Sequence, residues 1–455
     1  WPKIEIKNGK AGQVIEVKGD HGAPCRYTLV ADGPTTLEPR FAWGSGPTTL
    51  TVTGLDESLT KDDVSIRLVR GDLPSVGSFK CSNPWFNTLH ETVVRTFDNY
   101  ILDYPLDPMR EKQGWTQDIQ NFFNTASCLT DSADFYRRWW RDIVDNQRPN
   151  GLTGSVSPLL GQMVHDWNSP WWSGVIAWLP TEHYLYYGDA SFLEEAYEPM
   201  KLYVDYLDRL ATAGAGTRLL DYPEQQSFLN KEAGAEKMLI WNGANDWLNP
   251  MYPKSPPGYS RSNEGPLVSM SAWYLYANNV SRIARMLATN ADAEKYAAMA
   301  EGIARRTNDK FLDRTTGRYG ETDNNQTAQA LPLAVGMVPP ELRGQTFERL
   351  LESIDKHDDH HATGFVALPY LLQLLTESRQ SGLANRIVNQ DDYPSWKTLS
   401  HHGVLSEKWD GGGAQMPSCG GAVGMWFHIS VLGLRPDPAG PGFKRFILAP
   451  QPDPA

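Results

Sequence analysis

Apolar residues recur with the 3.6-residue period of an α-helix from Trp85 to about Leu434. In one such segment Phe135, Trp139 and Ile143 share a helix face. We count about a dozen segments of this kind, joined by loops rich in Trp, Asp, Gly and Pro. An α-solenoid would show a sequence repeat, and none is visible. The pattern therefore favours a mainly α fold in which six helix pairs close into an (α/α)6 barrel, or toroid, whose loops converge on one face.

One helix has a particularly clear predicted start. Ser191 is followed three residues later by Glu194, which is the pattern of a capping box and places the first turn at Ser191. The residues expected on its buried face are Leu193, Ala196, Met200, Val204 and Leu207.

The first 79 residues follow a different pattern. Residues 4–7, 14–17 and 49–52 alternate between apolar and polar side chains, and turns rich in Gly and Pro separate them. We predict a β-sandwich domain, or its remainder, over residues 1–79, and the helical barrel over 80–435. Residues 436–455 are rich in Pro and resemble the start of a further β-domain, which would make this chain a truncated one.

Composition excludes several classes of function. The 455 residues have a formal net charge of −12, which argues against nucleic acid or an anionic membrane as a partner. No run of about 18 apolar residues is present, so no membrane span is expected. The four cysteines lie far apart and form no zinc pattern, and the histidines of residues 356–361 are interpreted as a solvated helix end. We therefore predict no metal and no cofactor, while oligomeric state and localisation are not indicated.

The segment from Asp103 to Asp118 has the highest density of acidic residues. It places Asp107, Glu111 and Asp118 near one another, with Arg110 among them. Crowded carboxyl groups raise one another's pKa values, whereas a nearby Arg lowers them. A glycosidase needs this difference, because one carboxyl group donates a proton while the other is ionised. The alternative is a set of helix caps and surface ion pairs.

A second acidic position lies far downstream, at Glu407. It is followed by Trp409-Asp410 and then by three glycines, Gly411 to Gly413. Such a loop allows the backbone to approach a ligand closely, and Glu407 would polarise a water molecule. An ordinary loop glutamate is the alternative, and composition alone favours it.

Loops that pair Trp with Asp, Asn or Ser lie between these two segments. They contain Trp172, Asp246 with Trp247, and Trp396. Aromatic faces next to hydroxyl-binding polar groups suit a carbohydrate pocket. A single tryptophan of this kind is more often part of the core, but several such loops in one helical domain favour sugar binding.

Residues 107–118, Asp-Pro-Met-Arg-Glu-Lys-Gln-Gly-Trp-Thr-Gln-Asp, resemble the acidic signature of glycoside hydrolase family 78, the α-L-rhamnosidases. Six further segments are similar to the family in the same order, namely residues 71–84, Asn245–Leu248, Ala362–Leu372, Ser406–Gly411, Gly421–Trp426 and residues 433–446. The sequence departs from the family at residues 415–420, where the family usually carries a substrate-binding His, and in the loop that ends at Gly174, which lacks the usual Gly-Asp pair.

The resemblance implies an (α/α)6 barrel preceded and followed by β-domains, and a reaction that inverts the anomeric centre. It implies that Glu111 is the general acid and Glu407 the general base. The substrate-binding residues expected from the resemblance and from the aromatic loops are Asp107, Arg110, Trp115, Asp118, Trp172, Asp246, Trp247 and Trp396. The expected partner is a carbohydrate that contains rhamnose.

Two alternatives remain at this point. One is a related (α/α)6-barrel glycosidase or lyase that acts on another sugar, although a lyase should show a Tyr/His pair beside a cation site. The other is a carbohydrate-binding protein without catalysis, which would have no need for both Glu111 and Glu407.

Overall fold

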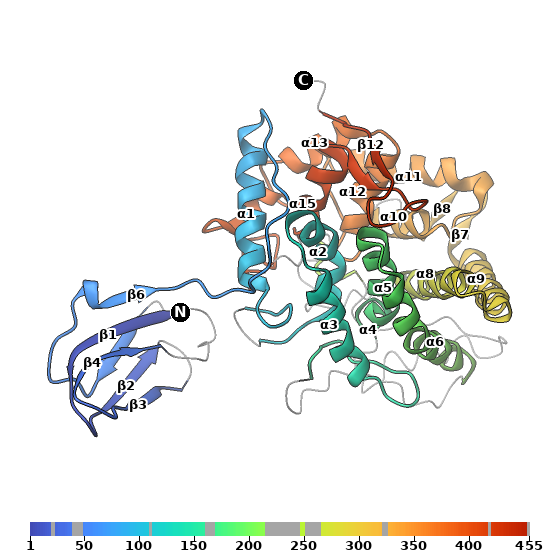
Figure 1. Cartoon of the computed structure of the whole chain (residues 1–455). Coiled ribbons are helices and arrows are strands. Elements are labelled where there is room, and N and C mark those ends of the chain that lie inside the picture. The colour runs from blue at the N-terminus through green and yellow to red at the C-terminus, as the bar shows by residue number, and fades with distance from the viewer. Residues whose placement is uncertain are drawn as a thin grey trace.

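The computed structural model describes residues 1–19, 23–38, 49–108, 112–159, 169–213, 246–250, 265–320, 326–416 and 420–452. Strands occupy the first part of the chain, and helices dominate from Pro84 onward (Figure 1).

The N-terminal strands form two small antiparallel sheets. Their bounds are β1 Pro2–Gly9, β2 Val14–Gly19, β3 Cys25–Thr28, β4 Gly33–Leu37, β5 Leu50–Thr53 and β6 Val64–Ile66. One sheet has the order β4-β1-β6 and the other β3-β2-β5. Alternate residues of both sheets enclose one small core that includes Ile4, Ile6, Ile15 and Val17. This alternation is the pattern that predicted strands in this region.

The segment after β6 leads from the sheets to the helices and pairs with their connecting loops (Figure 1). The amide of Gly71 donates to the carbonyl of Ile101 at 2.8 Å, and that of Val76 donates to Leu129 at 2.9 Å. These bonds attach the connecting segment to the helical part of the chain.

Among the described residues, six helices form a closed inner ring. They are α2 Thr116–Leu129, α5 Val175–Tyr187, α8 Gly265–Met286, α10 Gln326–Val335, α12 Leu368–Glu377 and α15 Ala422–Trp426, which a π-helical turn, Phe427–Val431, continues. Each contacts the next in this order, and α15 contacts α2, so the ring closes. The predicted mainly α toroid is confirmed.

A second layer of helices surrounds the ring. Its members are α1 Pro84–Tyr100, α3 Ala133–Asp145, α6 Ala190–Ala213, α9 Asn290–Phe311, α11 Arg343–Asp355 and α13 Ser381–Asn389. Most pack on the inner helix adjacent in sequence, as α6 does on α5 and α9 on α8. The aromatic rings of Phe97 on α1 and Phe122 on α2 stack with centroids 5.3 Å apart.

Short elements complete the chain. They are the single turns η1 Lys61–Asp63, α4 Pro170–Ser173, η2 Pro340–Leu342 and α14 Trp396–Leu399, and the strand pairs β7 Leu312–Asp313 with β8 Arg318–Tyr319, β9 Ser400–His401 with β10 Val404–Leu405, and β11 Leu434–Pro436 with β12 Phe446–Leu448.

The predicted start of α6 is wrong by one residue. The helix begins at Ala190, and the carboxylate of Asp189 accepts a hydrogen bond from the Ser191 amide at 3.0 Å. Asp189 therefore satisfies the first free amides in place of Ser191. The predicted buried face is confirmed, because Leu193, Ala196, Met200, Val204 and Leu207 are at most 2% exposed.

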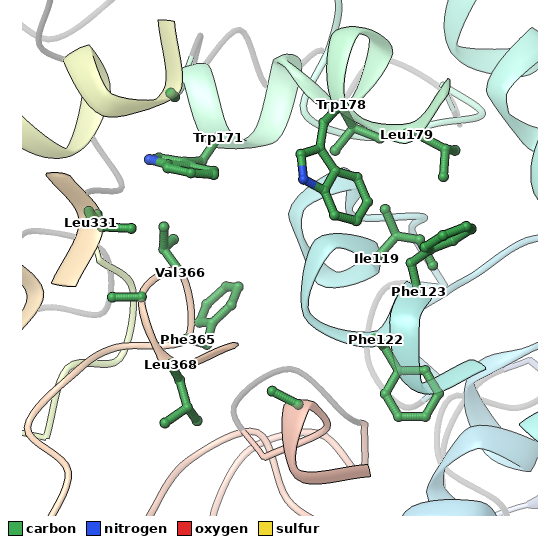
Figure 2. Close-up of a cluster of buried hydrophobic side chains, with 14 of the residues drawn as sticks. Ile119, Phe122, Phe123, Trp171, Trp178, Leu179, Leu331, Phe365, Val366 and Leu368 are labelled. Atoms are coloured by element: carbon green, nitrogen blue, oxygen red, sulfur yellow. The ribbon is translucent and has the colours of Figure 1, made fainter. Parts of the chain in front are cut away.

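Aromatic and aliphatic side chains fill the inner ring. In Figure 2, Trp171 lies on the side of Leu331, Val366 and Phe365, whereas Trp178 lies toward Ile119 and Phe123. The rings of Phe123 and Trp178 meet edge to face at 5.9 Å. Within the described residues, no helix has the length and apolarity needed to cross a membrane.

Candidate active site

The acidic segment leads into the N-terminus of inner helix α2. Asp107 and Asp118 are buried, at 1% and 4% exposed, and Asp118 stands in the first turn of α2, where the helix dipole favours a negative charge. Burial raises the pKa of the Tyr100 phenol well above its ordinary value, and the charges of Asp118 and Asp107 raise it further. Tyr100 therefore lies close enough to both carboxylates to interact with them electrostatically.

The loop that precedes α2 is fixed by backbone pairing. The amide of Asp107 donates to the carbonyl of Gln113 at 2.9 Å, and that of Ser157 donates to Gly114 at 2.8 Å. A Cβ atom on Gly114 would lie 2.0 Å from the Ser157 carbonyl oxygen, so only glycine fits here. Trp115, the N-cap residue of α2, is half-buried and pairs with Val156.

Trp172 belongs to the short helix α4, next to the start of α2. Its carbonyl accepts a hydrogen bond from the Thr116 hydroxyl at 2.7 Å. Its indole ring meets Phe365 edge to face at 5.6 Å and Trp247 at 6.4 Å. Trp172 is 3% exposed and Trp247 half-buried, so Trp247 presents more surface to a ligand.

Asp246 connects three segments of the chain. Its Oδ2 atom accepts from the Gly364 amide at 2.6 Å and from the Thr327 hydroxyl, and its Oδ1 atom accepts from the Ala367 amide at 3.1 Å. Burial raises its pKa to about 6, although these hydrogen bonds oppose the increase. A Cβ atom on Gly364 would lie 2.4 Å from the carbonyl oxygens of both Asp246 and Trp247. The Asp246 carboxylate thus holds the loop that precedes α12.

Glu407 lies in a tight turn whose ends pair with each other. Its amide donates to the Ala414 carbonyl at 2.7 Å, and the Ala414 amide donates to Glu407 Oε2 at 3.1 Å. The side chain is 6% exposed. Gly413 has a φ of +80°, and a Cβ atom there would lie 2.4 Å from Oε2. Gly413, the last glycine of the run predicted to allow close approach, therefore packs against the carboxylate itself.

Trp396 is fully buried and supports the turn that leads into α15. Its indole N–H donates to the Gly420 carbonyl at 3.0 Å, and its ring meets that of Trp409 edge to face at 5.7 Å. The direct contact with a sugar that we expected of Trp396 is not compatible with 0% exposure in this structure. Its contacts give it a supporting role.

The predicted site residues that the structure describes lie in the loops, short helices and first helical turns at the N-terminal ends of inner helices. Neighbouring loops are linked by the contacts of Thr116 with Trp172 and of Trp172 with Phe365. The Thr125 hydroxyl accepts from the Met425 amide at 2.8 Å and donates to the Gly421 carbonyl at 2.9 Å, which connects α2 with α15. The structure thus brings these loops to one end of the ring.

Arg110 and Glu111 lie outside the described residues, as do Asn245 and residues 417–419. Among the residues that are described, no group of three or more His, Cys, Asp or Glu is arranged to hold a metal ion.

Sequence reasoning missed His361. We expected residues 356–361 to be a solvated helix end, but this expectation is wrong for His361, which is 1% exposed. Its ring lies 4.0 Å from that of Trp409. The apolar residues that follow it, through Phe365 and Val366, were the available signal that the chain returns to the core at this point.

Comparison with known proteins agrees with this architecture. The family profile of the bacterial alpha-L-rhamnosidase 6 hairpin glycosidase domain matches residues 74–431. A protein of Streptomyces avermitilis named alpha-L-rhamnosidase is 28% identical over 448 residues, which cover 94% of this chain and 39% of that protein. A protein of the same name from an Alteromonas species is 25% identical over 444 residues, which cover 93% of this chain and 45% of that protein.

Solved structures give the same result. An alpha-L-rhamnosidase from Dictyoglumus thermophilum superimposes with a TM-score of 0.81 at 29% identity, covering 99% of this chain and 50% of that one. The Streptomyces avermitilis alpha-L-rhamnosidase, solved in complex with L-rhamnose, superimposes with a TM-score of 0.78 at 25% identity. The match covers 99% of this chain and 43% of that one.

A helical ring with its acidic and aromatic loops at one end is the architecture of the six-hairpin glycosidase domain. The chain belongs to glycoside hydrolase family 78, the family of the α-L-rhamnosidases. It spans 39% to 50% of the length of the relatives and structures described above.

Proposed function

We propose that this chain hydrolyses terminal α-L-rhamnosides with inversion of configuration. The family match over residues 74–431 carries the proposal. Its support within the molecule is the location of Asp107, Asp118 and Glu407, three buried carboxyl-bearing residues in the segments that lead into inner helices α2 and α15. The domain limits 1–79, 80–435 and 436–455 are part of the proposal, and the change from strands to helices at Pro84 supports the first of them.

In the proposed reaction, Glu111 protonates the glycosidic oxygen as the aglycone leaves. Glu407 removes a proton from a water molecule that attacks the anomeric carbon from the opposite face. The hydrogen bond from the Ala414 amide to Oε2 fixes the orientation of the Glu407 carboxyl group, which we assign to the water.

Substrate binding is divided between charged and aromatic groups. We assign contacts with sugar hydroxyls to Asp107, Arg110 and Asp118, and contacts with the apolar face of the sugar to Trp115 and Trp247. Both of these tryptophans are half-buried, so each retains surface for stacking.

Three other predicted site residues receive supporting roles in this proposal. Asp246 shapes the pocket, because both of its oxygens accept hydrogen bonds from protein donors. Trp172 and Trp396 are at most 3% exposed and pack behind the residues that contact the sugar.

The test is hydrolysis of p-nitrophenyl α-L-rhamnopyranoside by the chain and by its Glu111→Gln and Glu407→Gln variants. Each substitution removes a proton-transfer group at nearly constant shape, so kcat should fall about 10²- to 10⁴-fold. Circular dichroism would establish that the variants remain folded, and Glu194→Gln, a substitution of an exposed residue on α6, serves as the control. Activity of folded Glu407→Gln close to that of the unsubstituted chain would contradict the assignment of the base. Hydrolysis of another aryl glycoside in place of the rhamnoside would contradict the sugar.

A further inference from the structure

Three aromatic rings form a compact cluster behind the turn that carries Glu407. The His361 ring lies 4.0 Å from the Trp409 ring, centroid to centroid, with an interplanar angle of 49°. It also lies 5.6 Å from Trp396, whose ring meets Trp409 edge to face at 5.7 Å. All three side chains are at most 2% exposed. We call these residues the His361–Trp396–Trp409 cluster.

The backbone on both sides of His361 is firmly anchored. Gln326 on α10 donates to the His360 carbonyl at 3.0 Å and accepts from the Ala362 amide at 2.7 Å. Two residues further on, the Gly364 amide donates to the Asp246 carboxylate at 2.6 Å. These bonds fix His361 relative to two neighbouring segments, so its ring is a rigid surface on which another residue can pack.

Trp409 is that other residue, and it belongs to the turn of the proposed base. The turn is closed by the Lys408 amide, which donates to the Gly412 carbonyl at 3.0 Å, and by the pairing of Glu407 with Ala414. Glycine occupies positions 411–413, and glycine restricts the backbone less than other residues do. Hydrogen bonds within the turn define its shape but not its orientation. The turn is attached to the rest of the barrel by the Ser406 amide, which donates to the Leu399 carbonyl at 3.1 Å, and by the packing of Trp409 on His361.

Among the described residues, neither nitrogen of the His361 imidazole makes a hydrogen bond of standard geometry, although the Thr363 backbone interacts weakly with the ring. The Trp409 indole N–H is likewise buried without a partner. A buried polar group without a partner costs about 1–3 kcal/mol, so hydrogen bonding by these two side chains does not stabilise the cluster. The contact between them is one of aromatic surfaces.

Burial keeps the imidazole neutral. It lowers the pKa of His361 to about 3, and the nearby His360 lowers it further. A protonated ring at this position would add an unpaired buried charge to the cluster, which proteins avoid. The ring thus remains an uncharged packing surface at neutral and mildly acidic pH.

We propose that His361 is a positioning residue for Glu407, which acts by packing its ring against Trp409 and so orients the turn that carries the base. This inference rests on the proposed function of Glu407. The aromatic ring itself is the required feature, since neither nitrogen makes a hydrogen bond of standard geometry to a described residue.

The first test compares His361→Ala with His361→Phe, using hydrolysis of the aryl rhamnoside and thermal unfolding. Removal of the ring leaves a cavity beside Trp409, so the turn that carries Glu407 should move. Because misplacement of a catalytic group mainly slows the chemical step, kcat should fall about 10²-fold, while KM should change less than about threefold. The acidic limb of the kcat–pH profile should also move, because the surroundings of Glu407 change. Phe retains an aromatic face and should restore kcat to within about fivefold of the original value. His357→Ala, a substitution of a half-buried histidine in the same six-residue motif, is the matched control.

Two results of this experiment would overturn the inference. One is a folded His361→Ala variant with unchanged kcat and pH profile. The other is an equal loss in the Ala and Phe variants, which would mean that stacking is not the required feature.

The second test does not depend on activity. The chain is labelled with 5-fluorotryptophan, and the ¹⁹F resonance of Trp409 is identified by its absence in Trp409→Phe. His361→Ala should shift or broaden this resonance, whereas His361→Phe should perturb it less and His357→Ala should leave it unchanged. An unperturbed Trp409 signal in His361→Ala would refute the positioning contact. This readout remains decisive even if Glu407→Gln retains activity and the proposed function fails.

Discussion

The backbone amide of Ala414 donates a hydrogen bond to Glu407 Oε2 at 3.1 Å, while the Glu407 amide donates to the Ala414 carbonyl at 2.7 Å. One residue thus fixes both the backbone and one carboxylate oxygen of the proposed base. Pre-organisation of this kind is effective only if the turn has a single conformation.

The first prediction concerns Gly413, which has a φ of +80° and whose added Cβ atom would lie 2.4 Å from Glu407 Oε2. Gly413→Ala must displace the carboxylate or open the turn, so kcat should fall about 10²-fold on the aryl rhamnoside. At the neighbouring Gly412, a Cβ atom would approach only the Asp410 side chain, at 3.1 Å, so Gly412→Ala is the control. Equal activity of the two variants would show that the turn does not hold Glu407 in place.

Asp246 should be required for stability as well as for activity. Asp246→Asn directs an amide group toward backbone and hydroxyl donors, which leaves at least one buried donor unsatisfied at a cost of about 1–3 kcal/mol. Urea unfolding at pH 7.5 measures this loss, and the exposed carboxylate in Asp391→Asn provides the control. An unchanged free energy of unfolding would contradict the role of Asp246 as the connection between these segments.

Glu182, on inner helix α5, should destabilise the protein at alkaline pH. Burial raises its pKa from 4.5 to about 7, although Arg282 and the hydrogen bond from Asn124 oppose the increase. Because the folded-state pKa lies above the unfolded one, the free energy of unfolding should decrease as pH rises from 4.5 through 7. Glu182→Gln should therefore stabilise the chain at pH 8, on the order of 1–3 kcal/mol, and have little effect at pH 4.5.

Chemical unfolding of Glu182→Gln at both pH values measures this difference. The expected stabilisation is smaller than the free energy that corresponds to the full pKa shift, because Glu182 retains some accessible surface. The exposed Glu194→Gln should show no such pH dependence. A destabilised Glu182→Gln at pH 8 would mean that the electrostatic attraction of Arg282 outweighs the cost of burial.

His428 should make the fold sensitive to acid. Burial lowers its pKa to about 4, and the charge of the nearby His90 lowers it further. Here the folded-state pKa lies below the unfolded one, so stability is fully present above about pH 6.5 and decreases as pH falls toward 4. In His428→Phe the side chain cannot be protonated. Between pH 7.5 and pH 5 the free energy of unfolding of this variant should therefore decrease by roughly 2 kcal/mol less than that of the original chain. Urea unfolding at these two pH values measures the difference, and His357→Phe is the control. Equal losses of stability in His428→Phe and His357→Phe would contradict the prediction.

Much of the fold could be predicted because it depends on local periodicity. The alternation at Ile4 and Ile6 specified strands, and the spacing of Leu193, Ala196 and Met200 specified one face of α6. The closed ring could not be derived from any one helix, because it depends on contacts between elements far apart in the chain, such as α2 with α15.

The site was less predictable than the fold. Residue type and spacing drew attention to Asp107 and Asp118, whereas the role expected of Glu407 came from the resemblance to the family; the structure buries all three residues. The hydrogen bonds of Asp246 and the burial of Trp396 and His361 were not visible, since they depend on partners such as Gly364 and Trp409 that only the folded chain brings together.

The most direct test of the account is ¹H NMR of the sugar released from p-nitrophenyl α-L-rhamnopyranoside in the first minutes of the reaction, before the anomers equilibrate. The account predicts that β-L-rhamnose appears first and that Glu407→Gln abolishes its formation. Initial release of α-L-rhamnose would contradict the inverting pair of Glu111 and Glu407, and a folded chain that released no rhamnose would contradict the proposed activity.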